Sequence, residues 1–332
     1  MARQAVAAKR QGSTQVSDWI GRVIGVLLML SAVGFALSRA PDRPVQTLVA
    51  RWALPPSEFT ELGGMIVHYR DEGPRSDRAP LVLLHGTGSS LHTWQGWVRA
   101  LQAQRRVITI DLPGFGLTGP HEGVWEGRPY DAETDADFVL ALLDELKVQR
   151  FSVGGNSLGG EVAWRLAARV PQRVERLILV SAAGPAFKPL QVPPGFLLAR
   201  TPVLNHIGDV LLPRALVAAS LASVYGDPSL VREEQVDRHF ELTLREGNRR
   251  ALAERLSAWV PGRDAERIAT LRLPTLILWG GRDRLIPPAV GRTFEAQIPG
   301  SRLVVFDDLG HVPQEEDPAR TVAVVREFLS AP

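Results

Sequence analysis

The pentapeptide GNSLG at residues 155–159 decides the fold of this chain. It follows the apolar run at 151–153, which predicts a strand, and it opens the segment 158–170, whose apolar spacing predicts a helix. A sharp strand-to-helix turn holds its central residue in a strained backbone conformation, and the flanking glycines leave room for the turn. The pattern therefore predicts that Ser157 stands at the carboxyl end of a strand as a nucleophile.

A serine nucleophile needs a base, and the base needs an acid that orients it. The chain has seven histidines, and only His311 lies in a glycine-flanked loop after a late apolar run, at 302–306. Asp283 follows another such run, at 275–279. Each residue taken alone also has a non-catalytic interpretation. Ser157 could be an unreactive serine in a glycine-rich turn, Asp283 a solvated acid in a loop, and His311 a histidine that caps a helix. Their order along the chain, each after a strand end, favours a catalytic triad of Ser157, Asp283 and His311.

An attacking serine creates an oxyanion, which needs backbone donors placed in advance. The N–H of Leu158 is the first candidate, because this residue follows the nucleophile and begins a helix. The loop at 85–90 is expected to supply the second donor, the N–H of Thr87, and Gly86 is expected to let the substrate approach the backbone. Trp94, just beyond this loop, is expected to contact the substrate; the alternative is that its ring belongs to the core.

Short apolar runs bounded by turn residues recur through the chain and alternate with helical patterns. Runs that are apolar on both faces are typical of buried strands in a mostly parallel sheet. The alternation predicts an α/β fold with an eight-stranded, mostly parallel sheet and helices on both faces. The expected strands are 59–62, 65–69, 81–84, 106–110, 151–153, 176–180, 275–279 and 302–306.

One stretch, residues 184–270, contains no convincing strand. It begins with five prolines and continues with helical patterns at 231–245 and 249–259. We therefore expect a helical cap over 184–270, inserted into an α/β core formed by 57–183 and 271–332. The apolar residues at the start of the cap either line a pocket for a hydrophobic group or pack the cap on the core. They are Phe187, Phe196, Leu197, Leu198, Val203, Leu204, Ile207, Val210, Leu211 and Leu212.

Five motifs together resemble the α/β-hydrolase superfamily, in its esterase, lipase and carbon–carbon-bond hydrolase branch with a helical cap. They are LLHGTGSSLHTW at 83–94, IDLPGFGLTGP at 110–120, VGGNSLGGEVAW at 153–164, LILWGGRDRLIP at 276–287 and DDLGHVPQEEDP at 307–318. The resemblance covers residues 59–330. It implies Ser157 as nucleophile, His311 as base and Asp283 as orienting acid, with no metal and no organic cofactor. Haloalkane dehalogenases and epoxide hydrolases use an aspartate nucleophile, so the serine disfavours both.

The N-terminal segment carries a long uncharged apolar stretch. Residues 23–37 are fifteen positions without a charge, and the three apolar residues at 19–21 extend the stretch towards the roughly 20 residues that span a bilayer. Arginine and lysine side chains precede the stretch, which favours a cytoplasmic N-terminus. The sequence thus predicts a cytoplasmic tail at 1–18, a transmembrane signal anchor at 19–38 and a linker at 39–56. The catalytic domain is then expected on the non-cytoplasmic side of a membrane.

Two alternatives stay open for the same segment. A small-x-small site at 36–38 fits a cleaved signal peptide, which would leave a secreted or periplasmic protein. A hydrophobic helix that docks on the domain is the third interpretation.

Composition excludes several classes of protein. The chain has no cysteine, so disulfides and thiolate catalysis are ruled out. Its net charge is +2, but residues 1–51 carry seven basic and two acidic side chains, which leaves the rest of the chain mildly acidic. Nucleic-acid binding needs basic side chains clustered on a folded face, so no nucleic-acid partner is expected.

The leading hypothesis is a serine hydrolase that cleaves a carboxylic ester through an acyl-enzyme, acting on a small hydrophobic substrate. The enzymatic alternative is hydrolysis of a carbon–carbon bond in a vinylogous diketone. An alternative of another class is a non-catalytic, membrane-tethered α/β binding module. The sequence leaves the natural substrate and the oligomeric state open.

Overall fold

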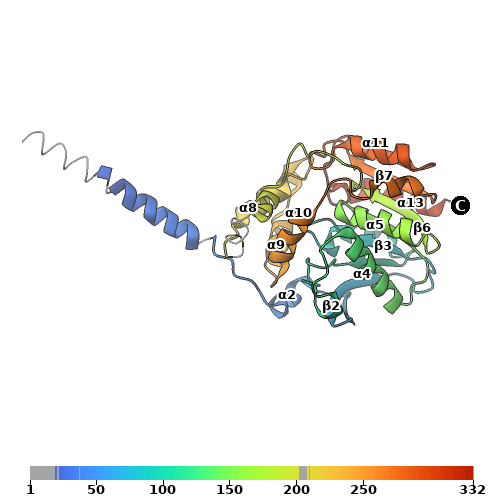
Figure 1. The fold of residues 1–332 in the computed structure, drawn as a ribbon, viewed down its shortest axis with the longest axis horizontal. Helices are drawn as coiled ribbons and strands as arrows, with labels where there is room; N and C mark the ends of the chain where they lie inside the picture. Colours follow the sequence, from blue (N-terminus) through green and yellow to red (C-terminus); the bar gives the residue numbers. More distant parts are fainter. Residues whose placement is uncertain (1–18, 21, 37, 202–207, 209, 332) are drawn as a thin grey trace, which may run out of the picture.

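An eight-stranded sheet forms the centre of the molecule (Figure 1). The computed structural model describes residues 19–20, 22–36, 38–201, 208 and 210–331. The strands are β1 (Ser57–Leu62), β2 (Met65–Glu72), β3 (Leu81–Leu84), β4 (Val107–Ile110), β5 (Phe151–Asn156), β6 (Val174–Val180), β7 (Thr275–Gly280) and β8 (Arg302–Phe306). Their order is β1-β2-β4-β3-β5-β6-β7-β8; β2 is antiparallel to both neighbours and the other pairs are parallel. The predicted α/β fold with a mostly parallel sheet is confirmed.

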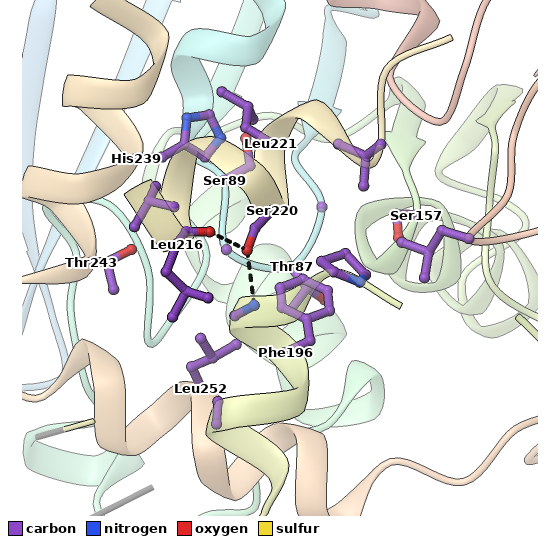
Figure 2. Close-up of a pocket in the computed structure, with 18 of the residues that line it drawn as sticks. Thr87, Ser89, Ser157, Phe196, Leu216, Ser220, Leu221, His239, Thr243 and Leu252 are labelled. Carbon is purple, nitrogen blue, oxygen red and sulfur yellow. Dashed lines mark hydrogen bonds between the residues drawn. The ribbon is translucent and has the colours of Figure 1, made fainter. Parts of the chain in front are cut away.

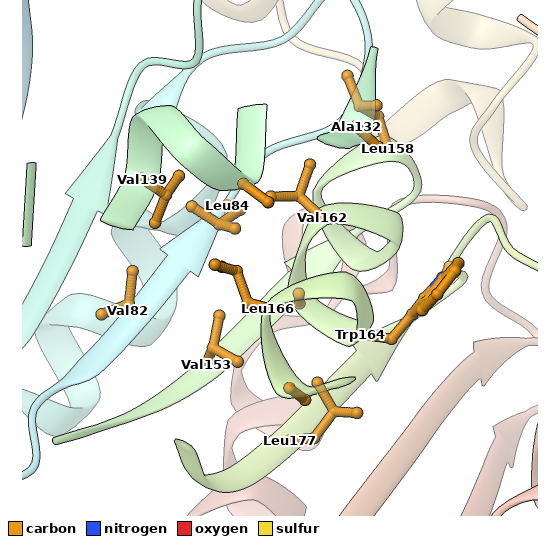
Figure 3. Close-up of a cluster of buried hydrophobic side chains, with 14 of the residues drawn as sticks. Val82, Leu84, Ala132, Val139, Val153, Leu158, Val162, Trp164, Leu166 and Leu177 are labelled. Atoms are coloured by element: carbon orange, nitrogen blue, oxygen red, sulfur yellow. The ribbon is translucent and has the colours of Figure 1, made fainter. Parts of the chain in front are cut away.

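Helices cover both faces of this sheet. They are α3 (Gln95–Leu101), α4 (Ala132–Glu145), α5 (Leu158–Arg169), α11 (Pro288–Gln297), α12 (Pro313–Glu316) and α13 (Pro318–Ser330). Alternate residues of β3 serve the two faces: Val82 and Leu84 belong to the cluster with α4 and α5 (Figure 3), whereas Leu81 and Leu83 belong to the cluster with α3 and α13. Because side chains alternate along a strand, an all-apolar strand requires cover on both sides.

The cap lies between β6 and β7. Its described helices are α6 (Pro194–Arg200), α8 (Arg214–Ala222), α9 (Glu233–Thr243) and α10 (Asn248–Ala258), with short turns of 3-10 helix at Pro228–Leu230 and Ala265–Thr270. No strand occurs in the described part of residues 184–270. The cap leaves the sheet at the carboxyl end of β6, the edge where ligands bind in open α/β folds, and the chain then returns to the amino end of β7.

The segment at 39–56, predicted as a linker, is instead packed against the cap. Its backbone pairs with cap residues: Ala40 N–H donates to Val210 O at 2.9 Å, and Glu246 N–H donates to Arg43 O at 3.0 Å. The segment also contains helix α2 (Val45–Trp52). The linker prediction for this proline-containing segment is therefore wrong.

Helix α2 packs against the body of the protein through its apolar face and is bound to the cap through one acidic side chain, Glu241. Its buried residues Leu48 and Trp52 join a small apolar cluster with Leu117 and Leu242. On the same helix, Trp52 Nε1–H donates to Glu241 at 2.7 Å. Arg51 also donates to Glu241, at 2.7 Å. A part-buried carboxylate that satisfies an indole N–H is expected to contribute more than an exposed ion pair.

The N-terminal apolar segment is helical at residues 22–36, and every residue of that stretch is exposed. Figure 1 shows this helix standing away from the α/β body rather than docked on it. Within the described residues, no helix combines the length and the apolar character that crossing a membrane requires. The tail at 1–18, together with residues 21 and 37, lies outside the described residues. The anchor at 19–38 stays a prediction.

We expect Glu241→Ala to lower the free energy of unfolding by about 1–3 kcal/mol, because it leaves the Trp52 indole N–H without its acceptor. Urea denaturation of the full chain, followed by tryptophan fluorescence, measures the change. Glu327→Ala is the matched control: it breaks an ion pair with Arg302 whose two side chains are mostly exposed, and it should change the stability by less than about 0.5 kcal/mol. Equal effects of the two substitutions would contradict the role given to Glu241.

Candidate active site

Ser157 occupies a one-residue turn between β5 and α5. Its backbone has φ +55° and ψ −116°, a conformation that side-chain-bearing residues rarely adopt. Two backbone bonds to the end of β6 hold it: Ser157 N–H donates to Val180 O, and Ala183 N–H donates to Ser157 O, each at 3.0 Å. A Cβ atom on Gly155 would lie 2.1 Å from the backbone of Gly159, so the predicted need for glycine here is real.

His311 and Asp283 form a buried hydrogen-bonded pair. His311 Nδ1 lies 2.8 Å from Asp283 Oδ2, and both residues are almost fully buried. The other carboxylate oxygen of Asp283 accepts the N–H groups of Leu285 and Ile286, at 3.0 and 2.9 Å. A carboxylate only accepts, so Nδ1 carries the proton and Nε2 is left as the acceptor. The pair therefore presents a nitrogen that can take up a proton.

Ser157 and His311 line the same pocket. The hydroxyl of Ser157 and Nε2 of His311 make no direct hydrogen bond among the described contacts, as is common before a substrate tightens a site. Asn156 connects the two residues instead: its side-chain amide donates to Val180 O at 3.1 Å and to His311 O at 3.0 Å. No local pattern in the sequence indicated this role of Asn156, because its two acceptors lie 24 and 155 residues further along the chain.

The loop that carries His311 is fastened to the cap. His311 N–H donates to Val224 O at 2.7 Å. The carboxylate of Glu316 accepts the N–H of Gly226, at 2.7 Å, and that of Gly310, at 2.8 Å. A Cβ atom on Gly310 would lie 2.3 Å from the backbone of Gly226, so the two backbones touch. The cap thus fixes the position of the histidine loop, which no sequence motif indicated.

The two predicted oxyanion donors belong to different elements: Leu158 is the first residue of α5, and Thr87 lies in the loop that follows β3. Neither Thr87 N–H nor Leu158 N–H donates a hydrogen bond to another described residue. Gly86 and Thr87 line the pocket with Ser157, and a Cβ atom on Gly86 would lie 3.1 Å from that of Ser157. The side chain of Leu158 is buried in the core, while its N–H begins α5. Both N–H groups are thus without an acceptor among the described residues, and of the two residues Thr87 lines the pocket whereas Leu158 does not.

The pocket is a mostly apolar cavity of about 150 Å³ between the turn and the cap (Figure 2). Three of the apolar residues at the start of the cap, Phe196, Leu198 and Leu212, line it, whereas Phe187 packs on the core. Trp94 does not line it, which corrects the expectation that this residue contacts the substrate. The ring of Trp94 is fully buried in the cluster under α3 and α13, because the chain turns inward at Leu91–Trp94.

The charged side chains at the pocket are already paired. Arg249 donates to Asp42 at 3.1 and 2.5 Å and to Gly208 O at 2.7 Å. Glu315 accepts from Tyr225 at 3.0 Å and from Arg238 at 3.2 Å. Burial alone would raise the pKa of Glu315, but the charge of Arg238 and the hydrogen bonds outweigh it and lower the pKa to about 2. Among the described lining residues, no cation is left unpaired.

A second hydrogen-bonded set of serine, histidine and aspartate lies near β1 and β2, the antiparallel strands at one edge of the sheet. His68 Nε2 lies 2.9 Å from the hydroxyl of Ser57, and its Nδ1 lies 2.7 Å from Asp111. Arg70 donates to the same hydroxyl at 3.1 Å, and none of these residues lines the pocket described above. Asp111 also accepts the N–H groups of Leu91 and Leu117, at 2.7 and 2.8 Å, so its role is structural. The described residues contain no cluster of acidic and histidine side chains arranged for a metal ion.

With this geometry in place, comparison with known proteins gives the class. A model of the alpha/beta hydrolase family matches residues 81–324. The chain therefore belongs to the alpha/beta hydrolase family, as the motifs suggested, and it is a hydrolase.

Three individual proteins illustrate which members of the family this chain resembles. The chain is 30% identical to 2-hydroxymuconate semialdehyde hydrolase of Pseudomonas sp. (strain CF600) over 76% of its own length and 87% of the relative's. It resembles the crystal structure of the enol-lactonase from Burkholderia xenovorans LB400, with a TM-score of 0.67, 28% identity and coverage of 82% of this chain and 100% of the other. It shares its fold with a bacterial membrane phospholipase A, with a TM-score of 0.68, 23% identity and coverage of 96% and 98%.

We expect Asp283→Asn to lower kcat by about 10³–10⁴-fold, because a neutral amide no longer fixes the tautomer of His311 or stabilises its charged form. Hydrolysis of a short para-nitrophenyl ester measures the loss. Asp308→Asn is the control, since this carboxylate lies close in sequence to His311 but pairs with Arg320 at the surface. Similar rates for the two variants would argue against a role for Asp283 in orienting the base.

Proposed function

We propose that this protein hydrolyses carboxylic esters through an acyl-enzyme formed on Ser157. The observation that carries the proposal is the buried His311–Asp283 pair, which leaves Nε2 of His311 as a proton acceptor in the pocket that Ser157 also lines. The N–H groups of Thr87 and Leu158 support it, because neither has an acceptor among the described residues and an oxyanion formed at Ser157 needs such donors.

The proposed reaction has two halves. The hydroxyl oxygen of Ser157 bonds to the ester carbon while its proton passes to Nε2 of His311, and the N–H groups of Thr87 and Leu158 receive the oxyanion. The carbon–oxygen bond to the alcohol then breaks, and His311 returns the proton to the departing alcohol. Water repeats the sequence on the acyl-enzyme and releases the acid. Asp283 keeps its charge throughout and stabilises the protonated histidine.

Hydrolysis of a carbon–carbon bond is the second candidate, and the relative named 2-hydroxymuconate semialdehyde hydrolase favours it. A muconate-type substrate carries a carboxylate, and a buried carboxylate needs a cation or several donors. Arg249 is bound to Asp42 and Arg238 to Glu315, so the described pocket offers no free cation to such a substrate. This pairing supports an uncharged ester over a dienoate.

We expect Ser157→Ala to abolish the release of para-nitrophenol from short acyl esters and to abolish labelling by a fluorophosphonate. Ser57→Ala is the matched control, because Ser57 has the same kind of histidine and aspartate partners but no place in the pocket. It should keep the activity of the unchanged chain. Loss of activity in the control alone, or retention in Ser157→Ala, would refute the assignment.

Two further outcomes separate the other candidates. Faster turnover of a vinylogous diketone than of any ester would favour carbon–carbon hydrolysis. Absence of fluorophosphonate labelling in the unchanged chain would favour a non-catalytic binding module.

The proposal includes a tether to a membrane through residues 19–38, with the hydrolase on the non-cytoplasmic side. The exposed apolar side chains of residues 22–36 support it, because water-facing leucines and valines in one helix are unfavourable. The membrane phospholipase A of similar fold aligns with 96% of this chain, so that likeness extends into the N-terminal segment.

We expect the full chain to stay in the membrane fraction after washes with high salt and with carbonate. The reason is that an apolar helix buried in lipid is not released by screening of charges. Immunoblotting of the fractions, beside a peripheral protein as control, measures the distribution. Complete recovery in the soluble fraction would refute the tether.

A further inference from the structure

His239 is a histidine of the pocket that the proposed reaction does not use. It lies on α9 of the cap and lines the same cavity as Ser157. Figure 2 shows it on the far side of the cavity from that serine, above Leu216. The residues around it are mostly apolar. A polar atom of the His239 ring that faces this cavity therefore needs a hydrogen-bond partner.

Hydrogen bonding fixes which atom of His239 carries the proton. Its Nδ1 lies 2.8 Å from the backbone oxygen of Gln235, one turn earlier on α9. A carbonyl oxygen only accepts, so Nδ1–H is the donor. Burial, and then the positive charge of Arg238, lowers the pKa of His239 to about 4, so the ring is neutral near pH 7. In a neutral imidazole with Nδ1 protonated, Nε2 is a pure acceptor.

This acceptor has no partner within the described chain. The hydrogen bond to Gln235 is the contact recorded for the ring, and it uses Nδ1. Thr243 follows His239 by one helical turn, lines the pocket as well, and makes no side-chain hydrogen bond to a described residue. The cap therefore places one unused acceptor and one unused hydroxyl on the same face of α9.

We propose that His239 Nε2 accepts a hydrogen bond from an uncharged hydroxyl on the part of the substrate that enters the cap pocket. The inference rests on the proposed ester hydrolysis and names its substrate class: esters whose apolar chain carries a hydroxyl remote from the reacting carbonyl. Thr243 is placed to donate to the oxygen of the same hydroxyl.

Other ligand groups fit this position less well. A carboxylate has no proton at neutral pH, so it would face the lone pair of Nε2 with its own negative charge. An ammonium group could donate, but the one carboxylate among the described lining residues, Glu315, is already paired with Arg238, so a buried ammonium would lack an anion of its own. A plain alkyl chain would leave Nε2 buried without a donor, which is the costly arrangement. A hydroxyl both donates and accepts, and it adds no charge.

The test compares two series of para-nitrophenyl esters, straight-chain alkanoates of increasing length and the matching ω-hydroxyalkanoates, on the full chain. For the acyl chain that is long enough to reach α9, we expect kcat/KM of the hydroxy ester to be about tenfold higher than that of the alkanoate of the same length. A roughly tenfold ratio is what one net hydrogen bond contributes. His239→Leu should remove this preference and leave the alkanoates as good or better, whereas His239→Gln, which keeps an acceptor, should retain part of it. The control Glu234→Gln, exposed on the same helix, should behave as the unchanged chain.

The outcomes separate this inference from the proposed function. Turnover of both series with no hydroxyl preference at any length, or the same preference in His239→Leu, would overturn the role of His239 while ester hydrolysis stands. If neither series is turned over, calorimetric binding of methyl ω-hydroxyalkanoates and methyl alkanoates to Ser157→Ala decides. Tighter binding of the hydroxy compounds that is lost on adding His239→Leu supports the subsite; equal binding overturns it.

Discussion

The turn at Ser157 is the constraint on which the rest of the site depends. The chain passes from β5 into α5 within one residue, which forces a positive φ of +55° at a residue with a side chain. Such a conformation costs on the order of 1–3 kcal/mol and persists only where its surroundings hold it. Here they do: Ser157 is bonded to the end of β6 through Val180 and Ala183, and a Cβ atom on Gly159 would lie 2.1 Å from Leu84 O. No larger residue fits at that glycine, so the sheet and α5 lie as close together as their backbones allow.

The cap is part of this arrangement and not an accessory to it. It holds the histidine loop through Val224 and Gly226, and it is itself held by the segment after residue 38, through Glu241 and through the contact of Asp42 with Arg249. Arg249 lines the pocket, so contacts that begin near the N-terminal helix reach the cavity wall. Motion of the cap would therefore change the position of the base as well as the shape of the cavity.

The polarity of the pocket follows from how its charges are paired. Buried ions are stable only with partners, and Glu315 and Arg249 have theirs inside the protein. What the cavity offers a ligand is mostly apolar surface, the wall formed by Gly86 and Thr87 beside Ser157, and one neutral acceptor, Nε2 of His239. This set matches an uncharged ester with a remote hydroxyl better than an anion.

The sequence by itself determined the sheet and the helical content of the stretch at 184–270, because these depend on local patterns of apolar runs and strand ends. Glycine spacing and strand ends also singled out Ser157, Asp283 and His311 as candidates, and the structure brings these three residues to one site. It misjudged Trp94, whose ring could face either side of a short helical turn. It also took 39–56 for a linker, because the cap residue that holds Arg51 and Trp52, Glu241, lies 190 and 189 residues further along the chain. Only the tertiary structure decided which side chains meet: the carboxylate of one loop with the imidazole of another, the cap with the histidine loop, and each pocket cation with its anion. Contacts between distant segments depend on how the elements pack in three dimensions, and no local pattern in the sequence records them.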